Sequence, residues 1–596
     1  MSHSDLRSYL AELERAGDLA RIPPEVDPNQ EVTVIQHRVQ AAGGPALLFE
    51  RVKGSPWRLV TNLFGTRRRV EMVFGRHPAE IGGQIADLAE AIVPPSPGRL
   101  WAARRKLMQL MRARMRTVRS GPILDSETAP PRLDLLPCLT CWPGDGGPFF
   151  TLPLVHTADP ETGAGNLGIY RMQRYDAAST GMHWQIEKGG AFHFSKAARL
   201  GRPLPVSVIL GGPPALTIAA IAPMPEGVDE RLLAALIMGR PLDVIRRPTT
   251  GHRVPAGAEF LLEGSVWPGD IRREGPFGDH FGHYSHSADF PVYRVDRLLA
   301  RSGAIFPATV VGKPPQEDFH IGCALQEMTI PLLKMLRPAV RDLWAYPETG
   351  FHPLAVASVD ERYPREALKH ALGLLGEGQL SLTKVMIVVD SSVNARDFAA
   401  VSRAIWENLD PADGLHLLAP TPQDTLDFTG PAMNTGSRLI LLATRRDEGP
   451  LRSGSPPPPP PADDVAGPVA AMARLGDAFL IAQLRPGGQP EQARAALANH
   501  ETTRQYPFHV LVSEDVPLDD PMMILWGWFT RFDPLADLHP ASREPAGNRM
   551  ILRFPIAIDA TWKTGYRRPV EFDPEVERAV DDRWHSYGIE LRGRND

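Results

Sequence analysis

The chain has 596 residues, 43% of them hydrophobic and 23% charged, which is typical of a soluble globular protein of about two to four domains. Its 70 acidic and 65 basic residues leave a net charge of -5, so composition gives no signal for binding to nucleic acid or to a membrane. Three cysteines cannot build a disulfide framework, and neither an N-terminal leader nor a long apolar run directs the chain to a membrane. We therefore expect a cytoplasmic protein without a transmembrane segment.

The first 120 residues alternate between helical and strand patterns. Leucines recur at helical spacing before Gly17, which predicts an opening helix, and further helical and strand patterns follow at 31–42, 46–51 and 58–63. A long helix is predicted over 99–119, with an apolar stripe formed by Trp101, Met108, Met111, Met115 and Val118. Its eight Arg and Lys residues indicate a solvated face or an oligomer contact rather than an RNA-binding surface, because the chain as a whole is balanced in charge.

The region 121–312 consists of short β-rich runs separated by Gly and Pro, which predicts an antiparallel or barrel-like domain with a few inserted helices. The predicted strands lie at 150–156, 206–211, 215–221, 259–266, 292–298 and 305–311.

After residue 320, strand and helix patterns alternate, which predicts an α/β layer domain. Six consecutive prolines at 456–461 lie within the segment 453–464 and predict an extended, water-exposed connector. We find no sequence repeat of a useful period. The predicted strands are 354–359, 384–390, 439–443, 479–483, 509–512 and 550–554, and the predicted helices are 366–375 and 395–409.

Two carboxylates stand close together in residues 272–284, which read Arg-Arg-Glu-Gly-Pro-Phe-Gly-Asp-His-Phe-Gly-His-Tyr. Glu274 and Asp279 are separated by a Gly-Pro turn that excludes a helix. A tight loop can aim both acids into one cavity, and paired acids of this kind serve in general acid–base catalysis. The alternative is a surface turn that carries two solvated acids.

Further polar groups lie upstream of this loop. Asn166 and Glu230 offer hard oxygen ligands, which suit Mg²⁺, Mn²⁺ or K⁺ bridging a phosphate rather than Zn²⁺. Arg171, His183 and Lys188 add cationic or hydrogen-bonding groups. These residues predict a site for an anionic ligand. The alternative is structural, with Asn166 ending a turn and Arg171 in a surface ion pair.

Taken together, these motifs resemble the UbiD family of prenylated-flavin-dependent decarboxylases. The similar stretches are Asn166-Leu-Gly-Ile-Tyr-Arg171, Met182-His-Trp184 followed by Lys188-Gly-Gly-Ala191, Pro225-Glu-Gly-Val-Asp-Glu230 and Glu274-Gly-Pro-Phe-Gly-Asp-His-Phe-Gly-His-Tyr284. Pro314-Pro-Gln-Glu-Asp318 and Asp559-Ala-Thr561 also look like the family. The resemblance covers nearly the whole chain and thins between 415 and 545.

The resemblance implies a catalytic set of Arg171, Glu274 and Asp279, and a divalent metal held by Asn166 and Glu230. Some members add a metal-binding histidine, but the spacing of His193 does not match that position. The last acid is Glu in some members and Asp here, so the point of proton delivery is shifted. The residues implied to contact the prenylated flavin and its metal are Asn166, Ile169, Tyr170, Arg171, His183, Trp184, Gln185, Lys188, Gly189 and Glu230.

The implied fold is mixed α/β in three parts. An N-terminal α/β cap (1–120) precedes a prenylated-FMN-binding, split β-barrel-like domain (121–320), and a C-terminal α/β domain (321–596) carries the proline-rich linker. The implied activity is reversible, non-oxidative decarboxylation of an aromatic or α,β-unsaturated carboxylic acid with prenylated FMN, Mn²⁺ and K⁺. A separate flavin prenyltransferase would supply the cofactor, and homodimers or homohexamers are usual.

In this reading Arg171 holds the substrate carboxylate, Glu274 pairs with Arg171, and Asp279 or Glu274 returns the proton. A dry pocket predicts a raised carboxyl pKa that keeps the donor protonated. Two rival readings stay open: a non-catalytic assembly subunit of a carboxylase built from several subunits, and a hydrolase or lyase that uses the acids without flavin. Cys138 and Cys141 have redox or zinc spacing but no second pair, so we expect them to be structural.

Overall fold

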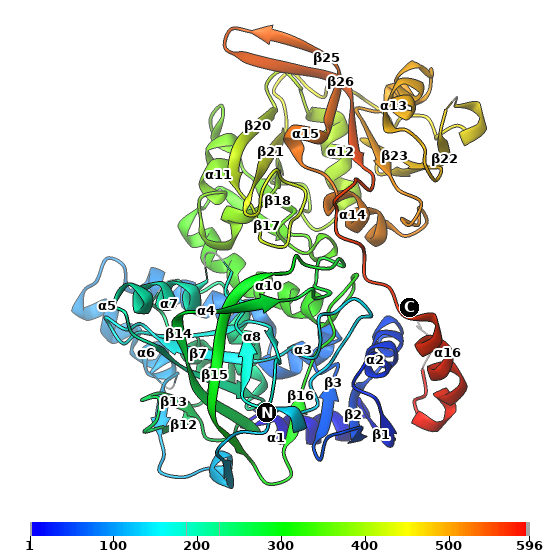
Figure 1. Cartoon of the computed structure of the whole chain (residues 1–596). Helices are drawn as coiled ribbons and strands as arrows, with labels where there is room; N and C mark the ends of the chain where they lie inside the picture. Colours follow the sequence, from blue (N-terminus) through cyan, green and yellow to red (C-terminus); the bar gives the residue numbers. More distant parts are fainter. Residues whose placement is uncertain (1–2, 112, 186–187, 226, 466, 592–596) are drawn as a thin grey trace. The chain divides into compact units, whose positions relative to one another are not determined.

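The computed structural model describes residues 3–111, 113–185, 188–225, 227–465 and 467–591 (Figure 1). The chain divides into two compact units. One comprises Met1–Thr329 with Arg568–Asp596, and the other comprises Ile330–Arg567. The mixed α/β class expected from the sequence is confirmed. No helix in the described ranges is long and apolar enough to cross a membrane.

The first unit begins with a four-stranded sheet in the order β1-β2-β3-β16, in which β1 and β2 are parallel. Its first helix, α1, starts at a capping box, because the Asp5 side chain accepts a hydrogen bond from the backbone N–H of Ser8. The strands are β1 (Leu19–Val26), β2 (Ala46–Val52), β3 (Arg58–Thr61) and β16 (Ile305–Pro307). The helices of this region are α1 (Leu6–Arg15), α2 (Glu31–Ala41), α3 (Arg67–Phe74), α4 (Pro78–Ile92), α5 (Pro97–Ala102) and α6 (Arg104–Leu110).

A seven-stranded antiparallel sheet forms the centre of this unit, in the order β10-β15-β14-β11-β7-β8 with β5 paired to β15. This path is open, so the described strands form no closed barrel. Its strands are β5 (Ser126–Thr128), β7 (Leu154–Ala158), β8 (Gly165–Ile169), β10 (Ser179–Gly181), β11 (Leu204–Leu210), β14 (Phe260–Glu274) and β15 (Ala288–Ala300). The last residue of β14, Glu274, pairs with the first of β15, Ala288, so the acidic loop is the connection of this long hairpin.

The first unit contains further strands and helices outside these two sheets. The additional strands are β4 (Met115–Thr117), β6 (Phe149–Phe150), β9 (Met172–Gln173), β12 (Leu242–Arg246) and β13 (Arg253–Pro255). The helices are α7 (Gly189–Arg199), α8 (Pro214–Ile221), α9 (Glu230–Met238), α10 (Glu317–Leu336) and α16 (Pro574–Arg583), with 3₁₀ turns η1 (Pro122–Leu124), η2 (Leu133–Leu135) and η7 (Trp584–Tyr587). The division between the units falls within α10.

Two predicted elements are wrong. The helix predicted over 99–119 is instead α5, α6 and then strand β4, which pairs with β12. The second half of its apolar stripe packs against a hydrophobic core, whereas Trp101 is 69% exposed, so the stripe does not lie on one continuous helix. The strand predicted over 215–221 is helix α8, which is apolar and almost wholly buried, and periodicity cannot separate a buried helix from a buried strand in so short a run.

The second unit contains two five-stranded sheets with the same plan. Each has an antiparallel, two parallel and an antiparallel pairing, in the orders β17-β18-β19-β21-β20 and β22-β23-β24-β26-β25. The first sheet uses β17 (Val340–Ala345), β18 (Leu354–Val359), β19 (Val385–Asp390), β20 (Leu415–Pro422) and β21 (Thr435–Ala443). The second uses β22 (Val469–Leu475), β23 (Phe479–Leu484), β24 (Phe508–Val512), β25 (Leu538–Ala546) and β26 (Arg549–Ala560). The repeat that the sequence did not reveal is therefore present in the fold.

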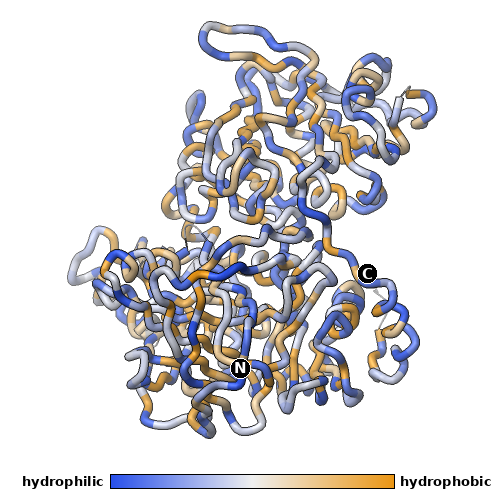
Figure 2. The backbone as a smooth tube through the Cα atoms, viewed as in Figure 1, coloured by the Kyte–Doolittle hydropathy of each residue, from blue (hydrophilic) through white to orange (hydrophobic). Residues whose placement is uncertain are grey.

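Helices between the strands complete each half, and each half has its own apolar cluster. The helices are α11 (Glu366–Leu374), α12 (Phe398–Asn408), α13 (Pro490–Asn499), α14 (Pro521–Phe529) and α15 (Pro534–Asp537), with 3₁₀ turns η3 (Pro347–Thr349), η4 (Gly378–Leu382), η5 (Ala462–Asp464) and η6 (Thr503–Gln505). Hydropathy follows this pattern, since the strands are largely apolar while the tip of the β25–β26 hairpin is hydrophilic (Figure 2).

The proline run is not wholly water-exposed, contrary to the sequence-based expectation. Pro456 is buried, and the Tyr506 hydroxyl donates a hydrogen bond of 2.5 Å to the carbonyl of Pro457. Proline cannot donate a backbone hydrogen bond, but its carbonyl still accepts one. The segment is thus attached to the second sheet of this unit at its first prolines.

Candidate active site

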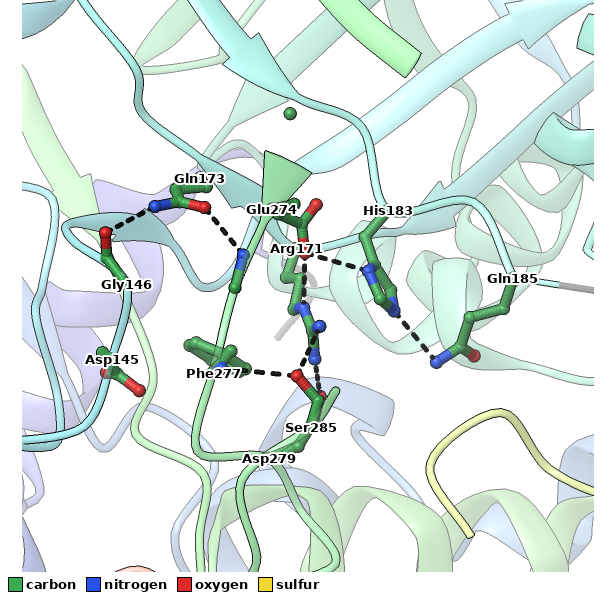
Figure 3. Close-up of polar contacts among 12 residues, drawn as sticks. Asp145, Gly146, Arg171, Gln173, His183, Gln185, Glu274, Phe277, Asp279 and Ser285 are labelled. Carbon is green, nitrogen blue, oxygen red and sulfur yellow. Dashed lines mark hydrogen bonds and ion pairs between the residues drawn. The ribbon is translucent and has the colours of Figure 1, made fainter. Parts of the chain in front are cut away.

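Arg171 lies at the centre of a buried polar cluster (Figure 3). Its Nε donates to Glu274 Oε1 at 3.1 Å, its Nη1 is paired with the Asp279 carboxylate, and its Nη2 donates to Ser285 Oγ at 2.9 Å. The guanidinium also lies over the ring of Phe277, 4.9 Å from the centroid. Arg171 follows strand β8, while its acceptors lie at the end of β14 and in the loop after it. The structure therefore brings the three predicted catalytic residues together.

Both acids of this cluster are held in their ionised form. Glu274 is fully buried and Asp279 is 9% exposed. Burial by itself would raise both pKa values, but His183 and Arg171 outweigh it at Glu274, and Arg171 and His280 outweigh it at Asp279, so both pKa values are lowered. The expectation of a raised donor pKa is therefore wrong for this arrangement, because the cation sits within direct hydrogen-bonding distance of each acid.

His183 extends the cluster. Its Nδ1 lies 2.9 Å from Glu274 Oε1, and its Nε2 lies 3.4 Å from Gln185 Nε2. Burial and the charge of Arg171 lower the pKa of His183 although Glu274 opposes them, which favours a neutral ring donating from Nδ1. The other oxygen of Glu274, Oε2, is buried and has no hydrogen-bond partner among the described residues, so it is available to a bound ligand.

A second group of predicted residues forms a cradle beside this cluster. The Tyr170 hydroxyl lies 3.3 Å from both Asn166 Nδ2 and the backbone N–H of Gly190. A Cβ atom at Gly189 would lie 2.1 Å from Asn166 Oδ1, and one at Gly190 would lie 2.5 Å from Trp184 Nε1, so only glycine fits at the start of α7. Trp184 Nε1 is itself buried without a partner among the described residues. A buried donor without a partner beside two glycines that leave no room for a side chain is a feature of a ligand site.

Glu230 begins helix α9 and accepts a hydrogen bond of 2.7 Å from the N–H of Leu167, the residue after Asn166. Burial raises the pKa of Glu230 to about 7. A bound cation would favour the ionised carboxylate, so Asn166 and Glu230 fit the hard-ligand metal site expected. The described residues contain no group of three or more His, Cys, Asp or Glu able to hold a metal.

The other predicted residues lie around these two groups. Ile169 ends β8 and packs against a hydrophobic core, and Lys188 is the N-cap of α7. His193, in α7, has Nδ1 2.9 Å from the Thr157 hydroxyl. Cys138 and Cys141 are buried free thiols, and burial raises the pKa of Cys138 to about 12, as expected of structural cysteines.

Sequence reasoning missed Ser285. Its hydroxyl accepts from Arg171 and also from the backbone N–H of Phe277 at 3.3 Å, which links the arginine to the acidic loop. The only sequence signal was its place immediately after the quoted motif, which ends at Tyr284. A single serine carries no pattern of its own.

Three family models match the chain in order. They are the N-terminal domain (residues 10–89), the Rift-related domain (116–314) and the C-terminal domain (319–443) of 3-octaprenyl-4-hydroxybenzoate carboxy-lyase, or UbiD. A Chlamydia pneumoniae protein named as a subunit of 4-hydroxybenzoate decarboxylase is 39% identical, with 98% of each chain covered. An uncharacterized protein of Chlamydia trachomatis is 40% identical over 98% of this chain and 99% of its own length.

Solved structures of a decarboxylase and of a UbiD-class enzyme are also similar to this chain. Vanillic acid decarboxylase of Sedimentibacter hydroxybenzoicus in its closed form has a TM-score of 0.68 and 25% identity, covering 78% of this chain and 97% of its own. The UbiD-class enzyme HmfF of Pelotomaculum thermopropionicum, solved in complex with FMN, has a TM-score of 0.62 and 27% identity, covering 75% and 95%. From the buried Arg171 cluster, the glycine-lined cradle and these matches, we conclude that the chain belongs to the UbiD family.

Proposed function

We propose that this protein catalyses the non-oxidative, reversible decarboxylation of an aromatic or α,β-unsaturated carboxylic acid with prenylated FMN. The observation that carries the proposal is the buried Arg171, which pairs with both Glu274 and Asp279 next to the Tyr170 cradle. The family membership and the decarboxylases among its relatives support the reaction class. A relative solved in complex with prFMN supports the cofactor.

The residues present fit such a cofactor, since Glu274 Oε2 and Trp184 Nε1 are buried without partners among the described residues. Tyr170, His183, Trp184, Gln185, Lys188 and Gly189 would surround it. Asn166 and Glu230 would hold Mn²⁺, with K⁺ nearby, against its phosphate. A prenylated flavin supplies, when bound, an electron sink for the carbon that loses CO₂. A separate flavin prenyltransferase would provide it, and we propose a homodimer or homohexamer in the cytoplasm.

Arg171 binds the substrate carboxylate in this mechanism. A planar guanidinium can hold a carboxylate through two parallel N–H donors. Because those donors are engaged with Asp279 and Ser285, an entering carboxylate has to compete with Asp279 for the arginine. The Asp279 carboxylate is then no longer paired with Arg171, whose charge lowers the pKa of Asp279. Burial, the largest influence that raises this pKa, then favours the protonated form of Asp279.

Asp279 is the proton donor in this scheme, with Glu274 as the alternative donor. A protonated Asp279 beside the substrate returns a proton to the carbon from which CO₂ has left. Glu274 keeps two partners, Arg171 and His183, and so fixes the orientation of the guanidinium. A positioned acid of this kind contributes about 10²–10⁴ in rate.

The test uses protein co-expressed with a flavin prenyltransferase, with 4-hydroxybenzoate and vanillate as substrates and CO₂ release as the readout. Arg171→Ala, Glu274→Gln and Asp279→Asn should each lower the rate by about 10²–10⁴. The matched control is Glu263→Gln, because Glu263 forms a buried two-hydrogen-bond pair with Arg247 at 2.9 Å in the same unit. If the first three variants keep the parental rate, the assignment is wrong.

A non-catalytic assembly role is the second candidate, since one relative is named as a subunit of a decarboxylase. The assembled Arg171–Glu274–Asp279 cluster speaks against it. A pull-down of partner chains together with the CO₂ assay separates the two, because an assembly subunit would release no CO₂ by itself.

A further inference from the structure

The acidic loop is hydrogen-bonded to a second loop, residues 142–147, to which the proposed function assigns no role. Asp145 Oδ1 accepts a hydrogen bond of 2.7 Å from the N–H of Gly278, the residue before Asp279. Its Oδ2 accepts from the N–H groups of Cys141 and Trp142, both at 2.9 Å. One carboxylate therefore joins the backbones of the two loops at the residue that precedes the proposed proton donor.

Gln173, in strand β9, forms hydrogen bonds with both of these loops. Its Oε1 accepts a hydrogen bond of 2.8 Å from the N–H of Gly275, and its Nε2 donates to the carbonyl of Gly146 at 2.7 Å (Figure 3). Gly146 N–H donates in turn to the carbonyl of Pro276 at 2.8 Å. Gln173 stands two residues after Arg171, so one short stretch of chain positions both the guanidinium and the loop that pairs with it.

The two loops approach too closely for side chains at two positions. A Cβ at Gly146 would lie 2.4 Å from the carbonyl oxygen of Gly275, and one at Gly278 would lie 2.2 Å from Trp142 Cδ1. Such contacts require glycine. The junction is therefore built from specific residues on both sides, and is not a chance contact of mobile turns.

Asp145 occupies a costly position for a carboxylate. Burial raises its pKa to about 7, while its three backbone hydrogen bonds and the charge of Arg171 act in the opposite direction. Its side-chain hydrogen bonds all go to backbone N–H groups of the two loops. A buried carboxyl group that accepts three backbone hydrogen bonds fixes the positions of the two backbones relative to each other.

We propose that Asp145 and Gln173 are positioning residues for the proton donor Asp279. They hold the backbone of residues 275–279 so that the Asp279 carboxyl reaches Arg171 before substrate binds and the reacting carbon afterwards. This inference rests on the proposed function, in which Asp279 returns the proton. Proton transfer depends steeply on donor distance, so a looser loop should slow the chemical step without weakening substrate binding.

The experiment compares flavin-loaded Asp145→Asn and Gln173→Ala with the parent enzyme, using 4-hydroxybenzoate or vanillate. We expect kcat to fall about 10- to 100-fold in each, with KM and flavin absorbance unchanged. The matched control is Asp176→Asn, because Asp176 also accepts from a backbone N–H, that of Ala178, and from the Ser179 hydroxyl, whereas its ion pair with Arg272 at 3.9 Å lies before the acidic loop, in strand β14. It should keep the parental kcat. If Asp145→Asn does not fold, Gln173→Ala decides alone.

A coupling measurement distinguishes positioning from general stability. In an Asp279→Glu background the longer donor no longer depends on the same loop geometry, so adding Asp145→Asn should cost much less than in the parent. Equal losses in both backgrounds, or falls in kcat that track falls in Tm, would overturn the proposal. If Asp279→Asn abolishes CO₂ release while Asp145→Asn and Gln173→Ala keep the parental kcat, the positioning role alone fails. If Asp279→Asn keeps the parental rate, the proposed function fails and this inference with it.

Discussion

The guanidinium of Arg171 serves three acceptors at once, Glu274, Asp279 and Ser285, in a setting with almost no access to water. Two carboxylates around one guanidinium leave the cluster with an excess negative charge, which the neutral ring of His183 does not offset and which His280, beside Asp279, offsets only when it is protonated. A substrate carboxylate adds a further negative charge. Uptake of a proton by one of the acids on binding is therefore the natural way to balance the site.

Arg171→Ala should lower stability in a pH-dependent way. With Arg171 present, both acids have lowered pKa values, so they stabilise the fold above their unfolded pKa values and this contribution is lost as pH falls. Without it, burial dominates and raises both pKa values, so stability falls as pH rises above about 4. We expect a loss of about 3–5 kcal/mol at pH about 7.5 and a much smaller loss at pH about 5, measured by urea unfolding. A loss independent of pH would contradict the charge assignment.

The sequence predicted which residues form the site better than it predicted the protonation state of the two acids. Arg171, Glu274 and Asp279 stand in long, ordered motifs, and the fold brings them together. The direction of the pKa shifts of Glu274 and Asp279 could not be predicted. It depends on whether burial or the nearby charge of Arg171 has the larger effect on each carboxyl group, and the distances that decide this are set by the fold. Ser285, Asp145 and Gln173 were not predicted as site residues, because their contacts with Arg171 or with the acidic loop join segments that lie far apart in the sequence.

At the scale of elements, the β14–β15 hairpin is the platform of the site. Its long antiparallel pairing ends at Glu274, the last residue of β14, and the acidic loop follows directly. The loop is then fixed from the other side by residues 142–147 and Gln173. A loop that is fixed on one side by a sheet and on the other by hydrogen bonds can hold the Asp279 carboxyl group in the position that proton transfer requires.

Gly146→Ala tests this close packing. The added methyl group would lie 2.4 Å from the Gly275 carbonyl oxygen, so we expect a loss of about 1–3 kcal/mol in the free energy of unfolding. The control is Gly83→Ala, in helix α4, where a Cβ has nothing within 4 Å and alanine should stabilise by about 0.5–1 kcal/mol. Urea denaturation of both variants gives the comparison. Equal effects would show that the two loops separate freely.

Element prediction failed where the local pattern was ambiguous. Helix α8 reads as a strand because all but one of its positions are apolar, and the segment 99–119 reads as one helix because its apolar spacing continues from α5 and α6 into strand β4. Strand β18, at 354–359, was predicted with the bounds that the structure has. It is a short, largely apolar run that charged residues follow directly, so its length favours a strand over a helix and its end is easy to place.

At the scale of the whole molecule, the chain returns to its first unit at the end. The backbone N–H of Tyr284 donates to the carbonyl of Arg568, and that of Val570 donates to the carbonyl of Gly282, so the last segment flanks the acidic loop. Beyond it, α16 lies beside α2 (Figure 1), and the Tyr587 hydroxyl donates to Glu31 at 2.6 Å. The C-terminal segment thus contacts both helix α2 and the acidic loop.

Truncation after residue 567 should loosen this support selectively. Hydrogen exchange should rise at the amide of Tyr284 and along α2, because their contacts with Arg568 and Tyr587 are removed. Strand β19 of the second unit serves as the internal control and should keep its protection. Uniformly faster exchange in both units, or no change at Tyr284, would contradict this role of the segment.

Most of the second sheet of the second unit falls in the region 415–545, where the family resemblance thins. The C-terminal family model ends at residue 443, and strands β22 to β26 lie beyond it although they repeat the strand order of the first sheet. The sequence could not reveal this repeat, because the same pairing plan accepts many combinations of buried apolar residues. Strand order is a property of contacts between distant segments rather than of a local period.

The most direct measurement is CO₂ release together with the absorbance spectrum of protein co-expressed with a flavin prenyltransferase. We predict a bound flavin chromophore and release of CO₂ from an aromatic acid such as 4-hydroxybenzoate or vanillate. Glu274→Gln should lower that release by about 10² or more, while the buried control Glu263→Gln should not. The absence of a chromophore, or a Glu274→Gln variant as active as the parent, would contradict the assignment of this cluster as a flavin-dependent decarboxylase site.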